Sequence, residues 1–339
     1  MSQLAATTDL SPALQLAALL QSTGIAPLDR TGWIRVTGED RVRWLNGMVT
    51  NSIQDLTPGT GNYNFILSVQ GRIQGDAYIF APTDPTSADL LIETSAKAVP
   101  SLIALLDRFI IMDDVELADV SAHRTGLLLA GPQAPALLQQ LGIDVANLPE
   151  LSVQCARWND AEVAVIRAHS PLVPKFELWA APATIAALTQ TLTTAGAIPA
   201  TPEATHWLRL LEGTPLYGTD IRDKELPQET AQTRALHFAK GCYLGQEIVE
   251  RIRSRGNVHR TFAAFRLHGN LPTPGTHLEA DGKQVGELTS LASIPLPGSA
   301  EPIQLALGYI RREALERNLP ITYPGGTAIS VNIPFNPVP

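Results

Sequence analysis

The chain has 339 residues, which is too long for one ordinary domain, because single domains usually hold roughly 100 to 200 residues. A formal net charge of −8 argues against nucleic acid or an anionic membrane as a direct partner, because both reward positive charge. With Cys155 and Cys242 as the two cysteines, a disulfide framework is excluded and a reducing compartment is expected.

The N-terminal stretch, residues 1–26, predicts an amphipathic helix. It lacks the basic start and the small-residue cleavage site of an export signal. No window of the sequence reaches the roughly 18 consecutive apolar residues that a membrane-spanning helix requires. We therefore expect a soluble, cytoplasmic, multidomain protein.

Strands and helices alternate through the next two hundred residues or so. Apolar runs bounded by turn residues predict strands at residues 33–36, 63–67, 76–80, 90–93, 126–130 and 163–166. Apolar residues at helical spacing predict helices at residues 39–46, 99–109, 134–141 and 184–195. The alternation indicates an α+β architecture that is repeated without detectable sequence repetition.

The last eighty residues or so predict strands with little helix. The strands are expected at residues 261–267, 277–280, 284–291, 302–310 and 328–333, with a short helix at 311–319. Asp281 and Gly282 form a favoured two-residue hairpin turn, because both tolerate positive φ. We expect a small β-barrel here, and we divide the chain into residues 1–125, 126–258 and 259–339.

The most informative stretch surrounds Cys242. Gly241 and Gly245 would let another molecule approach the sulfur closely, and Lys240 would favour the thiolate, which is the form that attacks or binds metal. The alternative is a small buried core residue, which is the commoner fate of a free cysteine. The flexible, polar neighbours favour reactivity, whereas Cys155, beside a predicted strand, is expected to be structural.

A family resemblance is carried by residues 240–247, Lys-Gly-Cys-Tyr-Leu-Gly-Gln-Glu. This octapeptide resembles the hallmark of the YgfZ-type folate-binding proteins, relatives of the glycine-cleavage T-protein in the aminomethyltransferase superfamily. Weaker similarities to the same family extend from about Leu28 to the C-terminus, at residues 36–40, 44–47, 70–73, 131–134, 285–290 and 306–310. The resemblance thus covers most of the chain.

The resemblance implies an α+β fold in which two ferredoxin-like α/β domains and a C-terminal β-barrel form a three-domain ring around a folate site. The implied ligand is tetrahydrofolate or a one-carbon derivative. The implied function is the assembly, maintenance or repair of iron-sulfur cluster proteins, with assembly factors or client iron-sulfur enzymes as partners. Cys242 and Lys240 are then the predicted catalytic residues, although whether a reaction is catalysed stays open.

A folate site needs an apolar slot, carboxylates or amides for the pterin edge and a cation for the glutamyl tail. Glu229 is the first choice for the pterin, and Arg251 or Arg253 for the tail. Asp76 and Tyr243 complete the predicted folate contacts. The alternatives for the arginine-rich segment, residues 251–260, are a solvated surface strand or an RNA-facing patch. The net negative charge of the chain disfavours the RNA-facing patch.

The sequence leaves two other functions open. The T-protein enzymes carry two adjacent aspartates where this chain has Gly75 and Asp76, and a helical glutamate where it has Leu211, with Glu212 one place later and expected to point elsewhere. Aminomethyl transfer is therefore the alternative, and a docking scaffold that uses folate only for stability is a third function. Hydrolase, nucleotide-binding and zinc-protease motifs are absent from the sequence, and no metal site is predicted.

Overall fold

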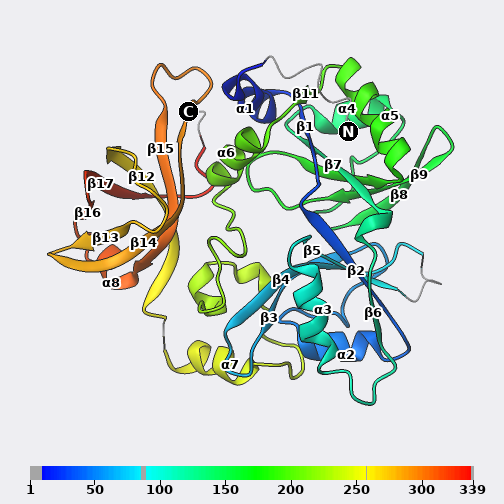
Figure 1. The fold of residues 1–339 in the computed structure, drawn as a ribbon, viewed down its shortest axis with the longest axis horizontal. Coiled ribbons are helices and arrows are strands. Elements are labelled where there is room, and N and C mark those ends of the chain that lie inside the picture. Colours follow the sequence, from blue (N-terminus) through cyan, green and yellow to red (C-terminus); the bar gives the residue numbers. More distant parts are fainter. Residues whose placement is uncertain (1–9, 85–88, 257, 337–339) are drawn as a thin grey trace.

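The structure is a computed structural model that describes residues 10–84, 89–256 and 258–336. Its strands form a five-stranded sheet, a six-stranded sheet and a closed barrel. Figure 1 shows the three parts around a central region that is crossed by irregular chain. The predicted fold class, two ferredoxin-like sheets followed by a barrel, is confirmed.

The five-stranded sheet has the order β3-β4-β5-β2-β6. Its residues alternate between two faces, and helices α2 and α3 cover the face that carries Ile34, Ile79 and Ile92. The opposite face carries Trp33 and Phe80 and meets the second sheet. The elements are β2 (Thr31–Thr37), α2 (Arg41–Met48), β3 (Gly61–Leu67), β4 (Ile73–Phe80), β5 (Leu90–Ser95), α3 (Val99–Asp107) and β6 (Glu116–Asp119).

The six-stranded sheet has the order β11-β1-β7-β10-β9-β8 and is covered by α4 and α5. Its first strand by sequence, β1, pairs antiparallel with β7 and parallel with β11, so the N-terminal segment joins strands that follow the entire five-stranded sheet. The elements are α1 (Pro12–Gln21), β1 (Gly24–Pro27), β7 (Thr125–Ala130), α4 (Ala134–Gln140), β8 (Val153–Trp158), β9 (Ala161–Arg167), β10 (Lys175–Ala180), α5 (Pro182–Thr194), β11 (Ile198–Pro199) and α6 (Pro202–Glu212).

The C-terminal barrel closes in the order β12-β15-β14-β13-β16-β17. Asp281 and Gly282, both at positive φ, connect β13 to β14, as predicted for this hairpin. The elements are β12 (Arg260–Gly269), β13 (His277–Ala280), β14 (Lys283–Ile294), β15 (Ile303–Arg311), α8 (Arg312–Glu316), β16 (Ile321–Tyr323) and β17 (Gly326–Val331).

The connection from α6 to the barrel contributes most to the centre of the molecule. It contains two short 3₁₀ helices, η3 (Pro227–Thr230) and η4 (Thr233–Ala235), and then α7 (Gln246–Arg255). Another 3₁₀ helix, η2 (Ser121–His123), precedes β7. None of the helices in the described part of the chain combines the length and the apolar character that crossing a membrane requires.

The structure differs from the sequence-based expectations at three places. The helix expected at residues 1–26 is α1, which ends at Gln21 and is followed by β1; residues 1–9 lie outside the described part. The alternative of a surface strand for the arginine-rich segment does not hold up to Arg255, because these residues form helix α7. Cys155 is exposed on β8 and is not a packed core residue. The domain division at residues 125 and 258 stays a proposal, with β1 hydrogen-bonded outside its assigned region.

Candidate functional site

Polar side chains gather on the face of β4 that is turned away from α2 and α3. Because residues alternate along a strand, Asp76 and Tyr78 share this face while Ala77 and Ile79 pack under the helices. Tyr63, opposite Tyr78 on β3, donates a hydrogen bond from its hydroxyl to Oδ2 of Asp76 at 2.6 Å. The rings of Tyr63 and Tyr78 lie 4.8 Å apart.

Arg234, in η4, lies over this pair of rings. Its guanidinium carbon is 4.3 Å from the ring centre of Tyr63 and 5.5 Å from that of Tyr78, and Nη2 donates to the Tyr78 hydroxyl at 3.1 Å. Nη1 of Arg234 is buried and has no hydrogen-bond partner in the described part of the chain. We call Asp76, Tyr63, Tyr78 and Arg234 the central polar cluster, and its unused donor suits an oxygen atom of a ligand.

Burial controls the protonation of this cluster. It raises the pKa of Asp76 to about 6, against the opposing effects of the Tyr63 hydrogen bond and the positive charge of Arg234. It also raises the pKa of Tyr78 to about 12, so this phenol stays neutral. Asp76 therefore changes its charge close to neutral pH, as carboxyl groups that exchange protons with a ligand do.

A pocket of about 190 Å³ opens beside Arg234. Glu212, at the end of α6, lines it, contrary to the expectation from helix spacing that this side chain points elsewhere. One carboxylate oxygen of Glu212 accepts a hydrogen bond from Lys175 Nζ at 2.7 Å, and the other accepts one from the Ser170 hydroxyl. We call this space the central pocket; its lining also includes His169, Pro171, Gly213, Thr214, Ala231, Gln232, Thr233, Ile333 and Pro334.

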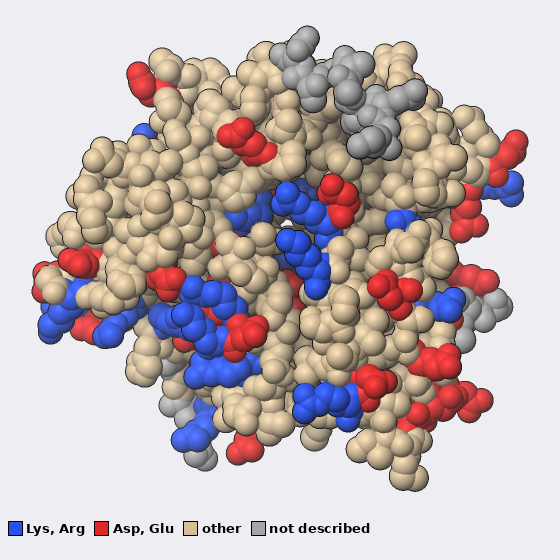
Figure 2. All heavy atoms as spheres, viewed as in Figure 1, with Lys and Arg blue, Asp and Glu red and all other residues tan. Residues whose placement is uncertain are grey.

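The position of this pocket agrees with the outer shape of the molecule. Its lining comes from the loop before β10, the end of α6, the η3–η4 segment and the C-terminal tail. Figure 2 shows a hollow near the middle of the viewed face, with both basic and acidic side chains at its rim. Residues far apart in sequence thus converge at the centre.

Two further carboxyl groups lie between the sheets. Glu93 on β5 is directly opposite Tyr78, and Glu177 on β10 accepts a hydrogen bond from Trp179 Nε1 at 2.9 Å. Burial raises the pKa of both groups, and the nearby charge of Glu177 raises that of Glu93 further. One proton shared between the two carboxyls is the arrangement that fits a buried pair of like charges.

The structure presents Cys242 on an anchored loop. Its thiol is exposed, so the alternative of a buried core cysteine is wrong. The Lys240 ammonium donates three hydrogen bonds, to the backbone carbonyls of Asn46 at 2.6 Å, Val49 at 2.8 Å and Asn51 at 2.7 Å. Burial lowers the pKa of Lys240 to about 8. An ammonium has three protons to donate, and Lys240 donates all three to these carbonyls. This lysine therefore anchors the loop and does not stabilise the thiolate of Cys242.

The other side of the loop is anchored by tight backbone packing. Leu244 donates its backbone N–H to the carbonyl of Gly47 at 2.9 Å. Gly245 has φ +80°, and a Cβ atom there would lie 2.5 Å from the backbone oxygen of Ser68, so only glycine fits. Tyr243 is buried in the same apolar cluster as Tyr63, which connects the cysteine loop to the central polar cluster.

The remaining predicted folate contacts lie away from the central polar cluster. Glu229 forms a bidentate ion pair with Arg260 of the barrel, with both nitrogen–oxygen distances 2.9 Å. Arg251 and Arg253 are exposed on α7, where Arg253 stacks on Phe238 at 4.5 Å. Among the five predicted contacts, the structure therefore brings Asp76 to the centre and Tyr243 close to it.

Sequence reasoning missed Arg234, Glu93, Glu177 and Lys175. Each is a single charged residue in an ordinary context, and only the folded chain shows that they converge. One available signal was the polar residue at every second position of β4 and at position 93 of β5, since a charged residue in an otherwise apolar strand is unusual. Among the described residues, no group of three or more His, Cys, Asp or Glu side chains could hold a metal ion.

Comparison with known proteins agrees with this geometry. The aminomethyltransferase T of the glycine cleavage system from Bartonella henselae superposes with a TM-score of 0.84 over 98% of this chain and 91% of that chain, at 20% sequence identity. At this identity the likeness shows the fold. The three-part architecture is therefore that of this aminomethyltransferase.

Sequence comparison identifies the family. A family model described as the GCVT N-terminal domain matches residues 13–240, and the chain belongs to this family. An aminomethyltransferase of Geobacillus kaustophilus is 28% identical over 82% of this chain and 77% of that protein. A tRNA-modifying protein YgfZ of Colwellia psychrerythraea is 26% identical over 83% of this chain and 82% of that protein.

A third relative is longer than this chain. The chloroplastic protein At1g60990 of Arabidopsis thaliana, named provisionally as a transferase, is 25% identical over 293 residues. These residues are 86% of this chain and 66% of that protein, just under two thirds. The relatives of this chain are thus named for different functions.

Proposed function

We propose that this chain binds tetrahydrofolate or a one-carbon derivative in the central pocket and supports the assembly, maintenance or repair of iron-sulfur cluster proteins through Cys242. The observation that carries the proposal is the exposed thiol on a loop held rigid at both ends, next to the central polar cluster. The similarity of residues 240–247 to the YgfZ-type hallmark and the YgfZ relative support the same function.

The residues at the centre suit the pterin of a folate. The pterin edge carries hydrogen-bond donors and acceptors. The unused Nη1 of Arg234, which lines the central pocket, and the Asp76 carboxylate, which adjoins the pocket in the central polar cluster, complement them. A pocket of about 190 Å³ is smaller than the roughly 300 to 1,000 Å³ typical of ligand sites, so the glutamyl tail would extend out of it. Bound tetrahydrofolate would supply a carrier for one-carbon units; Asp76 would accept or return a proton at its carboxylate.

The route of the tail follows from a neighbouring pocket of about 220 Å³ that Arg253 and Arg312 line. Both pockets share Ala231, Gln232 and Thr233, so this segment separates them. Arg253 stays our proposed contact for the anionic tail, whereas Arg251 is not among the lining residues of either pocket. Glu229 is not retained as a pterin contact, because its carboxylate is already paired with Arg260.

One observation favours a second candidate function, aminomethyl transfer. Asp76 keeps a titratable carboxylate at the centre although Gly75 replaces its neighbour, and the Geobacillus kaustophilus relative is named an aminomethyltransferase. This function predicts ammonia release from an aminomethyl-carrying protein when tetrahydrofolate is added, with loss of the release in Asp76→Asn. The preferred function predicts no such release.

The test of the proposed function combines binding with activity in cells. Calorimetric titration with tetrahydrofolate should show saturable binding that weakens about tenfold or more in Asp76→Asn, as expected for loss of a charge-assisted hydrogen bond. Binding should be unchanged in Cys242→Ser. Cells that carry Cys242→Ser should show reduced activity of an enzyme with a four-iron four-sulfur cluster.

The two measurements separate the alternatives. Folate binding with full iron-sulfur enzyme activity in the Cys242→Ser strain would favour the docking scaffold that uses folate only for stability. Absence of folate binding in the wild type would remove the cofactor and leave only the thiol function. The acidic total charge still argues against direct tRNA binding, although the YgfZ relative is named a tRNA-modifying protein.

A further inference from the structure

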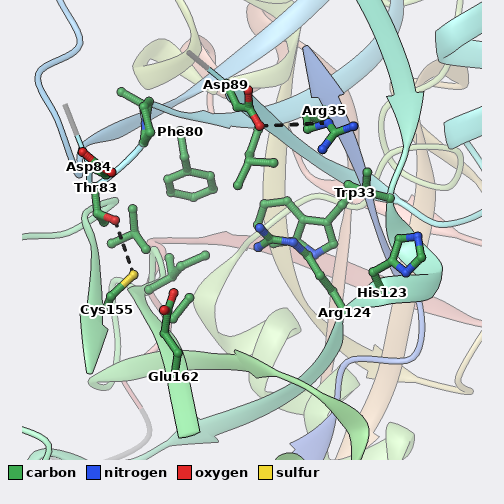
Figure 3. A pocket seen from close by; sticks show the side chains of 17 residues that line it. Trp33, Arg35, Phe80, Thr83, Asp84, Asp89, His123, Arg124, Cys155 and Glu162 are labelled. Atoms are coloured by element: carbon green, nitrogen blue, oxygen red, sulfur yellow. Dashed lines mark hydrogen bonds and ion pairs between the residues drawn. The ribbon is translucent and has the colours of Figure 1, made fainter. Parts of the chain in front are cut away.

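A second cavity, of about 480 Å³, lies between the two sheets. Its walls are the ends of β2, β4 and β5 on one side and β8 and β9 on the other, and it shares none of its described lining residues with the central pocket. Figure 3 shows its polar residues around an apolar interior. We call it the inter-sheet cavity. Ligand sites occur preferentially between domains and sheets of this kind and are of this size.

Arg124, which follows η2, presents an unused cation to the inter-sheet cavity. Its guanidinium carbon lies 5.0 Å from the ring centre of Trp33, a side chain that is only 1% exposed. Across the described residues, this guanidinium forms no hydrogen bond and no ion pair. Arg35, at the same cavity, differs because its Nε lies 4.0 Å from a carboxylate oxygen of Asp89.

A half-buried guanidinium that forms no hydrogen bond is costly, because it loses water without gaining another acceptor. Burial lowers the pKa of Arg124, but the nearby Cys155 and Glu162 act in the opposite direction. Arginine stays charged in proteins, so the cavity holds a fixed positive charge with free donors. Its planar fork matches a carboxylate, which it can bind through two parallel hydrogen bonds.

The rest of the cavity is suited to an apolar body. Half-buried aliphatic side chains form its accessible wall, namely Leu91, Val120, Val153 and Ala164. Phe80 and Ile166 are buried behind them. The negative charge of Glu162 acts on Arg124, and Asp84 and Asp89 also line the cavity, so a ligand with one negative charge suits the site better than one with two.

We propose that the inter-sheet cavity binds a small organic carboxylate, with the carboxylate on Arg124 and a ring-sized apolar body against Leu91, Val153 and Ala164. This site is independent of the proposed folate site. Cys155 provides a reporter, because its thiol is exposed, lines the cavity and lies 3.3 Å from the hydroxyl of Thr83.

The experiment uses the full-length chain with Cys242→Ser, which leaves Cys155 as the one thiol. The rate of alkylation of Cys155 by iodoacetamide is followed by intact mass at increasing concentrations of 2-naphthoate. The uncharged 2-naphthamide is the matched ligand control. We expect saturable protection by the carboxylate and much weaker protection by the amide.

Variants assign the effect to Arg124. Arg124→Gln should raise the concentration of 2-naphthoate for half protection about tenfold or more, and Arg124→Lys by less, because it keeps the charge but loses the fork. Arg35→Gln, a matched change of a paired arginine at the same cavity, should leave it unchanged. Thermal unfolding shows which variants are folded. Equal protection by the amide, no protection by the carboxylate, or an unchanged midpoint in a folded Arg124→Gln protein would overturn the proposal.

Discussion

Asp76 and Gly75 are neighbours in sequence but lie on opposite faces of β4. A Cβ atom at Gly75 would lie 3.5 Å from Leu102 Cδ1 and 3.7 Å from Ile66 Cδ1, so an aspartate there would face apolar side chains beneath α3. Asp76 instead accepts a hydrogen bond from the hydroxyl of Tyr63. Gly75 therefore does not remove the carboxylate from the centre, and the sequence argument against aminomethyl transfer loses part of its weight.

The raised pKa of Asp76 predicts a cost in stability. Its native pKa of about 6 exceeds the ordinary value of 3.8, so between these pH values the native state keeps a proton that the unfolded chain has lost. Stability contributed by this group therefore falls as the pH rises from about 4 to about 6 and stays lower above that. Asp76→Asn should be more stable than the wild type at pH 8, by about 1 to 3 kcal/mol, and similar to it at pH 4.

Urea unfolding of both proteins at the two pH values measures this difference. Tyr63→Phe is a useful control, because it removes the hydrogen bond that favours the charged carboxylate and should lower stability at pH 8. An Asp76→Asn protein that is equally destabilised at both pH values would show that the asparagine disrupts packing and that the carboxyl imposes no pH-dependent cost.

At the scale of elements, the cysteine loop depends on two glycines with different roles. Gly245 sits at positive φ against the turn between β3 and β4, whereas a Cβ atom at Gly241 would meet nothing within 4 Å. The sequence alone suggested that both glycines serve access to the sulfur. The structure assigns Gly245 to the anchoring of the loop and leaves Gly241 open to an approaching molecule.

This difference predicts that an alanine substitution destabilises the protein at Gly245 and has little effect at Gly241. Gly245→Ala should lower the free energy of unfolding by about 1 to 3 kcal/mol, because the new Cβ combines a strained φ with a contact to the Ser68 oxygen. Gly241→Ala should change it by less than about 0.5 kcal/mol. Guanidinium unfolding measures both, and comparable destabilisation by the two changes would contradict the assignment.

Elements with a strong local signal were predicted from sequence, and sites assembled from distant elements were not. Alternation predicted β2, β3 and β4, and the Asp281–Gly282 turn predicted the first hairpin of the barrel, because these signals depend on neighbouring residues. Strand β1 was missed, since its four residues gain their partners only from β7 and β11.

The same reason explains the outcome at the site. Lys240 was placed beside the thiol because it is two residues away in sequence, but its ammonium bonds to carbonyls about 190 residues earlier, as in the contact with Asn51. Glu229 was predicted to meet the pterin because it is a carboxylate, but its partner Arg260 is in the barrel. Sequence identified residue types that suit the chemistry and could not identify their tertiary partners.

At the scale of the whole molecule, a network of ion pairs holds the barrel against the central segment. Arg260 of β12 contacts Glu229 and Glu225, and Arg222 bridges Glu225 to Glu287 of β14. The side chain of Glu225 is fully buried and that of Glu229 is 9% exposed. Removal of Arg260 would therefore leave the buried Glu229 carboxylate without its cation, and Glu225 with Arg222 alone.

This network predicts a large effect for Arg260→Met. We expect a loss of about 3 to 5 kcal/mol of unfolding free energy at neutral pH, because a buried charge is left unpaired. Arg251→Ala, on the exposed surface of α7, is the matched control and should change it by less than about 0.5 kcal/mol. Urea titration checks both values. Similar unfolding midpoints for Arg260→Met and Arg251→Ala would show that the barrel depends little on this network.

The position of β1 in its sheet determines when this strand can pair during synthesis of the chain. Translation makes α1 and β1 before the five-stranded sheet, whereas β7, β11 and the Thr201 groups that donate to Gln15 at 2.8 Å emerge only after that whole sheet. That sheet is inserted between the first strand and its partners and can close on itself during translation. Strand β1 is thus made well before its partners and stays available to chaperones until β7 and β11 have emerged.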